Sequence, residues 1–227
     1  MQNSLTEASP AELDAELRAF IADRKFPCVG AKSAAATGGL VTLVASDINS
    51  ASDDAAIVCA LEAWADRHGT QRQGLYSLAV IFPETREIDE AAFEQAMWAR
   101  LQALADLDAR YGEPCDPLVS ADPANPEFAI SFGGKAFFIV GLHAAAARPA
   151  LRFAYPTMIF NLHAQFEELR ERQIFDRMRA QIIKRDIDLA GSPNPMLAGH
   201  GERSAARQYS GREVGDDWVC PFRDPRP

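Results

Sequence analysis

The chain has 227 residues, of which 48% are hydrophobic and 24% are charged, and its formal net charge is -9 at pH 7. This length and composition suit one large domain with a substantial hydrophobic core. The acidic residues are spread along the chain and no basic stripe is present, whereas nucleic-acid-binding proteins neutralise phosphates with clustered Lys and Arg. We therefore expect no nucleic-acid partner.

Cysteine spacing and hydropathy indicate where the protein works. The cysteines are widely separated and include no Cys-x-x-Cys pair, which argues against a zinc ribbon and against a disulfide-rich secreted domain. The polar segment Met1–Glu7 lacks the apolar core of a signal peptide. The longest apolar stretches, near Ala136–Ala147, are too short to cross a bilayer. We expect a cytoplasmic protein with reduced thiols, no membrane partner and disordered residues 1–8.

The first part of the chain predicts helix, turn and strand in succession. Ser9-Pro10-Ala11-Glu12 has the form of a capping box with Pro at the first helical position. This helix must end before Pro27, because the residue that precedes a proline avoids the helical region. Phe26–Gly30 is expected to form a turn, and the Ala/Gly-rich segment Ala34–Gly39 is expected to be mobile. Leu40–Ala45 has the composition of a strand.

Two longer helices and a second strand follow. Asp53–His68 has apolar residues at helical spacing and is followed by Gly69, a suitable C-cap. Leu75–Phe82 is a continuous apolar run of strand length. Asp89 can cap a further helix. The apolar stripe of that helix consists of Phe93, Met97, Leu101 and Leu104.

The C-terminal half predicts a hairpin, a short strand and one long helix. Phe128–Phe132 and Lys135–Leu142 flank Gly133-Gly134, and the second strand is apolar throughout, which favours a central position. Met158–Asn161 is expected to be a short strand. A helix near His163–Arg185 is expected to bury Phe166, Leu169, Phe175, Met178 and Ile182. These elements predict a single α+β domain over residues 1–227, with a central, mostly antiparallel sheet flanked by helices and a long irregular C-terminal segment.

Two histidines stand where a rigid element passes into a turn, a placement that fixes the orientation of an imidazole. His143 follows the apolar strand, and His163 begins the last long helix. Their separation differs from that of a helical two-histidine zinc motif. A histidine in such a position is more often a core or capping residue, so spacing alone does not identify a metal site.

Cysteines beside prolines provide a second type of candidate ligand. Cys220 lies in a Cys-Pro step between aromatic residues, and Cys28 lies in a comparable Phe-Pro-Cys turn. Such a thiol can bind haem iron as a thiolate, but a free cysteine is more often a small buried side chain that fills space.

Charged residues lie close to both histidines in the sequence. Arg148 and Arg152 follow His143, and a guanidinium group can pair with a carboxylate such as a haem propionate. Glu167 lies one turn after His163 and could pair with an amine or a guanidine. No phosphate-binding Gly-rich motif and no nucleophile elbow is present.

Several short sequence motifs, taken together, resemble those of one known family. They are Phe26-Pro27-Cys28-Val29-Gly30-Ala31-Lys32, Phe137-Phe138-Ile139-Val140-Gly141-Leu142-His143, Tyr155-Pro156-Thr157, Phe160-Asn161-Leu162-His163-Ala164-Gln165-Phe166-Glu167, Asn194-Pro195-Met196-Leu197, Gln208-Tyr209-Ser210-Gly211-Arg212 and Trp218-Val219-Cys220-Pro221-Phe222. Their order and content resemble the YqcI/YcgG family from about Phe20 to Phe222. The motifs between His143 and Cys220 are the most specific to this family.

The resemblance implies a haem-dependent monooxygenase, because characterised relatives N-hydroxylate the guanidine group of arginine or of an arginine-derived amino acid. It implies haem b as the iron cofactor and O2 or H2O2 as the oxidant. The implied partners are a small arginine-like or amine substrate and an electron-donor protein, and a homodimer is compatible with the pattern.

By this resemblance His163 is the leading axial ligand of the iron, and His143, Cys28 and Cys220 remain alternatives. His143 and Glu167 become the candidate catalytic residues. The remaining candidate cofactor contacts, including the arginines expected to hold the propionates, are Arg148, Arg152, Tyr209 and Arg212.

Two departures from the family pattern concern the substrate. Ala144–Ala147 replaces a segment in which the family has Pro and Ser, and Ser204-Ala205-Ala206 lacks the acid expected after the Ser. These departures imply a substrate that differs from that of other family members, and they bear less on the expectation of haem binding. Two other functions stay open: a haem-binding sensor or carrier without turnover, and a small-molecule-binding domain without haem.

Overall fold

The computed structural model describes residues 8–70, 74–85, 87–197 and 202–226. Its helices are α1 (Pro10–Ala22), α2 (Val29–Ala36), α3 (Asp54–His68), α4 (Glu90–Tyr111), α5 (His163–Glu171), α6 (Phe175–Ala190) and α7 (Ala206–Tyr209), with a short 3-10 turn at Pro149–Leu151. Its strands are β1 (Leu40–Val44), β2 (Ser77–Ile81), β3 (Ile130–Phe132), β4 (Lys135–Leu142) and β5 (Thr157–Leu162). The expectation of disorder at residues 1–8 lies outside the described residues except for Ala8, which packs half-buried against the α1 side of the core.

The strands form one sheet in the order β1-β2-β5-β4-β3. Only β1 and β2 pair in parallel, and the other neighbouring strands pair antiparallel. The β3–β4 hairpin turns at Gly133 and Gly134, which have φ angles of 54° and 68° in the left-handed region that favours glycine. The predicted single α+β domain with a mostly antiparallel sheet is confirmed.

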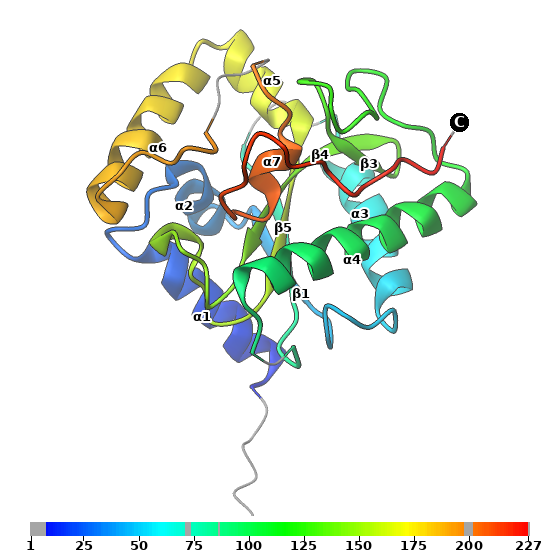
Figure 1. The fold of residues 1–227 in the computed structure, drawn as a ribbon, viewed down its shortest axis with the longest axis horizontal. Helices are drawn as coiled ribbons and strands as arrows, with labels where there is room; N and C mark the ends of the chain where they lie inside the picture. Colours follow the sequence, from blue (N-terminus) through cyan, green and yellow to red (C-terminus); the bar gives the residue numbers. More distant parts are fainter. Residues whose placement is uncertain (1–7, 71–73, 86, 198–201, 227) are drawn as a thin grey trace, which may run out of the picture.

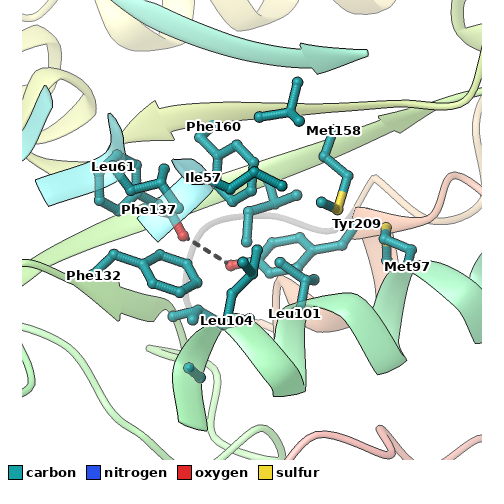
Figure 2. Close-up of a cluster of buried hydrophobic side chains, with 14 of the residues drawn as sticks. Ile57, Leu61, Met97, Leu101, Leu104, Phe132, Phe137, Met158, Phe160 and Tyr209 are labelled. Carbon is teal, nitrogen blue, oxygen red and sulfur yellow. Dashed lines mark hydrogen bonds between the residues drawn. The ribbon is translucent and has the colours of Figure 1, made fainter. Parts of the chain in front are cut away.

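Helices cover both faces of the sheet (Figure 1). On one face, α3 and α4 bury the larger hydrophobic cluster, in which Leu101, Phe137 and Phe160 are all 0% exposed. Figure 2 shows these side chains meeting between α4 and the strands. The other face carries a smaller cluster under α1 and α2, and α6 lies farther out on that side.

The helix ends that the sequence predicts are present. Ser9 and Glu12 form the reciprocal capping box of α1, and the Asp89 side chain accepts a hydrogen bond from the backbone N–H of Ala92 at the start of α4. The apolar stripe predicted for α4 is completely buried, because it faces the sheet along its whole length. Among the described residues, no helix combines the length and the apolar character that a membrane span requires.

Two predictions of local structure are wrong. The segment predicted as a turn and a mobile stretch contains α2, because alanine has the strongest helix propensity and the Cys28 sulfur accepts a hydrogen bond from the N–H of Ala31 at the helix start. The single helix predicted near His163–Arg185 is two helices, separated at Gln173, which has a φ of 57°. No Gly or Pro marks this break in the sequence.

Candidate functional site

Two adjoining cavities lie between the sheet and α6. The first has a volume of about 300 Å³ and extends from the middle of the sheet toward α2; we call it the Cys28 cavity. The second has a volume of about 260 Å³ and lies at the start of α5; we call it the His163 cavity. The residues that line both cavities are Phe138, Phe166, Met178, Ile182, Leu197 and Gln208.

The cavities arise because α6 presents an apolar stripe that does not reach the sheet. Alternate residues of β4, namely Phe138, Val140 and Leu142, point to this side because side chains alternate along a strand. Met178 and Ile182, one turn apart on α6, line the opposite wall. The stripe predicted as the buried side of this helix is therefore only half-buried, because most of its members line the cavities and do not pack into the core.

His163 lies in the wall of the cavity named after it. It is the first residue of α5, its side chain is 20% exposed, and its Nε2 is 3.7 Å from the Oε1 of Glu167. Glu167 also forms an ion pair with Arg170 and lines neither cavity. A metal-binding imidazole usually donates its second ring N–H to a carboxylate, which holds the ring in one orientation. Glu167 lies beside the ring but beyond hydrogen-bond distance of Nε2. The position of His163 in the cavity wall therefore fits a ligand, and Glu167 is a candidate positioning residue.

His143 lies on the other side of the sheet and lines neither cavity. It is 1% exposed and stacks on Phe93 of α4, with ring centroids 4.4 Å apart. Neither ring nitrogen has a hydrogen-bond partner among the described residues. Burial lowers the pKa of His143, although the nearby carboxylates of Glu90 and Asp89 act in the opposite direction. The structure therefore does not bring the two histidines together around one space.

The two candidate cysteines lie far apart in the fold. Cys28 lines the Cys28 cavity, and burial raises its thiol pKa. Cys220 lies in a surface groove beside Trp218 and Arg207, and burial raises its thiol pKa to about 12. Burial therefore favours the thiol over the thiolate at both cysteines.

Of the two arginines that follow His143, only Arg148 reaches a cavity. Its Nη2 is 2.5 Å from Oδ2 of Asp186 on α6, and it also donates to the carbonyl of Ser192. Arg152 donates to the carbonyls of Ala146 and Ala147, at 2.9 Å each, and fixes the turn that follows β4. Arg152 therefore acts within the loop, away from both cavities.

The residues of the segment Gln208–Arg212 lie partly in the hydrophobic core and partly along the cavities. Tyr209 is completely buried, and its hydroxyl donates to the carbonyl of Phe137 at 3.2 Å, as Figure 2 shows. Arg212 donates from Nε to Glu94 on α4 at 2.7 Å. Gln208, which precedes Tyr209, instead lines both cavities. Tyr209 and Arg212 therefore hold the C-terminal segment in place, whereas Gln208 lines both cavities and Gly211 lines the Cys28 cavity.

Several residues of the His163 cavity are not among the sequence-based candidates. Arg170, Arg179 and Arg203 line it and give it positive charge, with Glu127 as an acidic neighbour. Arg203 forms a long, exposed ion pair of 3.4 Å with Asp216. Arg203 is distant in the sequence from Arg170 and Arg179, and no local pattern distinguishes the three from surface charges.

Within the described part of the chain, no group of three or more His, Cys, Asp or Glu side chains could hold a bare metal ion. This observation has no bearing on haem, because a porphyrin supplies most of the ligands to its iron and the protein contributes one or two side chains. An apolar cavity with an imidazole in its wall and arginines along its lining has the donor set that a porphyrin with two carboxylates requires.

The fold and the cavities define a class: a single α+β domain that encloses two adjoining apolar cavities between its sheet and one covering helix. The profile of the YqcI/YcgG family matches residues 17–223, and the chain belongs to that family. Searches of the curated proteins and of the solved structures returned no significant match.

Proposed function

We propose that this protein is a haem-dependent monooxygenase that N-hydroxylates a guanidine or amine group of a small molecule. The observation that carries the proposal is the His163 cavity, where one imidazole and several arginines line an apolar space beside a second cavity. Membership of the YqcI/YcgG family supports it, through the resemblance to family members with this activity. The proposed location is the cytoplasm.

The lining of the His163 cavity includes a candidate residue for each kind of contact that haem makes. His163 would bind the iron, and Glu167 would fix the orientation of its ring. Phe138 and Phe166 provide apolar surface for the macrocycle. In place of Arg148 and Arg152, we assign the propionate contacts to the arginines that line this cavity: Arg170, Arg179 and Arg203.

When bound, haem would supply the oxidising chemistry that inserts one oxygen atom into an N–H bond. With O2, the second oxygen atom leaves as water, and its reduction requires two electrons from a donor protein and two protons from solvent; with H2O2, no external electrons are required. The chain itself orients the substrate and excludes water. The shared apolar wall of Phe138, Phe166 and Met178 would keep bulk water from the reacting nitrogen.

The test is the absorption spectrum of the purified protein, produced with ample haem precursor, in its oxidised and its reduced, carbon monoxide-bound forms. We expect a Soret band with imidazole ligation, and we expect His163→Ala to lose haem or to shift that band. His143→Phe is the matched control, because His143 lines neither cavity and a phenyl ring can stack on Phe93 in its place. An unchanged spectrum in His163→Ala would remove this histidine as the ligand.

A second measurement separates an enzyme from a haem carrier or sensor. The haem-loaded protein is incubated with candidate amines and guanidines, O2 and a reductant, or with H2O2, and products are detected by mass spectrometry. An enzyme adds one oxygen atom to the substrate, whereas a carrier leaves it unchanged.

A further inference from the structure

We propose that the Cys28 cavity is the substrate chamber and that it takes an aromatic amine that is uncharged at neutral pH, in preference to an arginine-like amino acid. This inference rests on the proposed function for the reaction at nitrogen. The aromatic character and the charge of the substrate are inferred from the residues that line the chamber.

The size and the lining of the chamber suit a small aromatic ligand. Its volume of about 300 Å³ is roughly twice that of the ~150 Å³ apolar cavity that binds benzene in an engineered protein. Val140, Ile159, Met178 and Met196 are among the apolar side chains around it. Because water finds few hydrogen-bond partners on such walls, an apolar ring displaces it favourably.

The polar side chains on the lining are mostly engaged by other groups of the protein. Ser77 donates to Asn161 at 2.7 Å, and the Gln165 side chain accepts from the backbone N–H of Tyr76 at 2.8 Å and donates to its carbonyl at 3.2 Å. These pairs tie neighbouring elements together. They leave these side chains little capacity to hold the several charged groups of an amino acid.

The charge balance of the chamber disfavours a cationic ligand. Asp186 is the only carboxylate among its described lining residues, and Arg148 engages it at 2.5 Å. A guanidinium or an alkylammonium group would have to be desolvated there without a free carboxylate, which is costly. An aromatic amine escapes this cost, because its nitrogen is neutral at pH 7.

Gln208 provides the polar contact that an uncharged amine needs. This residue lines both cavities, and its side-chain amide forms no hydrogen bond with any described residue. An amide oxygen can accept from an N–H of the ligand. Because Gln208 stands where the two cavities meet, this contact would place the nitrogen toward the His163 cavity, where the proposed haem lies.

The experiment measures binding by isothermal titration calorimetry at pH 7, on the full chain both with and without haem. The probes are 4-methylaniline and benzylamine, which are isomers but differ in charge at this pH, and L-arginine. We expect 4-methylaniline to bind at least tenfold more tightly than either cation. Equal or tighter binding of benzylamine or arginine would overturn the proposal.

Two variants place the binding in the Cys28 cavity. Ala31→Phe, on the α2 wall, should fill the chamber and abolish binding of 4-methylaniline, whereas Ala36→Phe, exposed on the same helix, should leave it unchanged. Gln208→Leu should weaken binding about three- to tenfold, the effect of one lost hydrogen bond. Circular dichroism verifies that each variant is folded, and unaltered binding in both cavity variants would contradict the assignment.

Haem binding and arylamine binding are measured separately, so that the failure of one proposal can be told from the failure of the other. If the protein takes up no haem but binds 4-methylaniline in this cavity, the proposed oxygenase function fails and the ligand preference stands. If haem binds at His163 but the arylamine does not bind, the substrate inference alone fails.

Discussion

The two faces of the sheet differ in how completely they are packed. Toward α3 and α4, side chains such as Leu101 and Phe160 have no exposed surface. Toward α6, Phe138 and Val140 of β4 and the apolar residues of the helix are only half-buried, and two cavities separate them. The same five-stranded sheet therefore derives its stability mainly from one face and offers space for a ligand on the other. The predictions below test this division.

The largest expected effect comes from the ion pair that holds α6. Arg148→Met would leave Asp186, which is 6% exposed, without its partner, and loss of one member of a buried pair costs about 3–5 kcal/mol. Hydrogen exchange should show faster opening of α6 and unchanged protection in α4. Arg203→Met, which breaks an exposed pair, is the control and should cost less than about 1 kcal/mol. Equal protection of α6 in both variants would contradict the prediction.

A matched pair of methionines compares the faces directly. Met97 on α4 is 0% exposed, whereas Met178 on α6 is half-buried beside the cavities. Met97→Ala should lower the free energy of unfolding by about 2–5 kcal/mol, because it creates a void in a packed core. Met178→Ala should lower it by about 1 kcal/mol or less. Urea denaturation measures both values, and similar losses would show that the α6 face is as tightly packed as the α4 face.

The smallest expected effect is a pH dependence on the packed face. Burial lowers the pKa of His143 in the folded state below its value in the unfolded chain. The folded protein therefore binds fewer protons than the unfolded chain, and stability falls as the pH drops from about 6.5 toward the folded pKa. The slope from one such group cannot exceed about 1.4 kcal/mol per pH unit.

The variant His143→Phe isolates this contribution, because Glu90 and Asp89, the carboxylates that act on His143, remain in place. Denaturation of both proteins between pH 7.5 and 5 should show a smaller loss of stability in the variant. Parallel curves for the two proteins would mean that His143 does not titrate differently in the folded and unfolded states.

The sequence predicts the elements whose signals are local. The apolar stripe of α4 and the Gly133-Gly134 hairpin are examples, because periodicity and turn chemistry act over a few residues. The helix α2 was missed because its small side chains produce almost no apolar stripe. The break at Gln173 was missed because its positive φ belongs to a residue type that rarely adopts it.

The candidate site is less predictable, because it depends on distances between elements. Phe166, Met178 and Ile182 have the spacing of a core stripe, and only the position of α6 turns them into a cavity wall. Of the two histidines that the sequence singles out, His163 lies in a cavity wall. It cannot show that His143 lies on the opposite face or that Arg148 is engaged by Asp186.

The C-terminal segment has a consequence for the order of folding. Tyr209 and Phe222 belong to the cluster under α4, where they join Trp98 and Phe128. That cluster also includes Ile57 of α3, so contacts that seal it span most of the chain. During synthesis, the α4 face must stay open until residue 222 has left the ribosome. Such a high contact order predicts slow folding and a nascent chain that exposes apolar surface to chaperones.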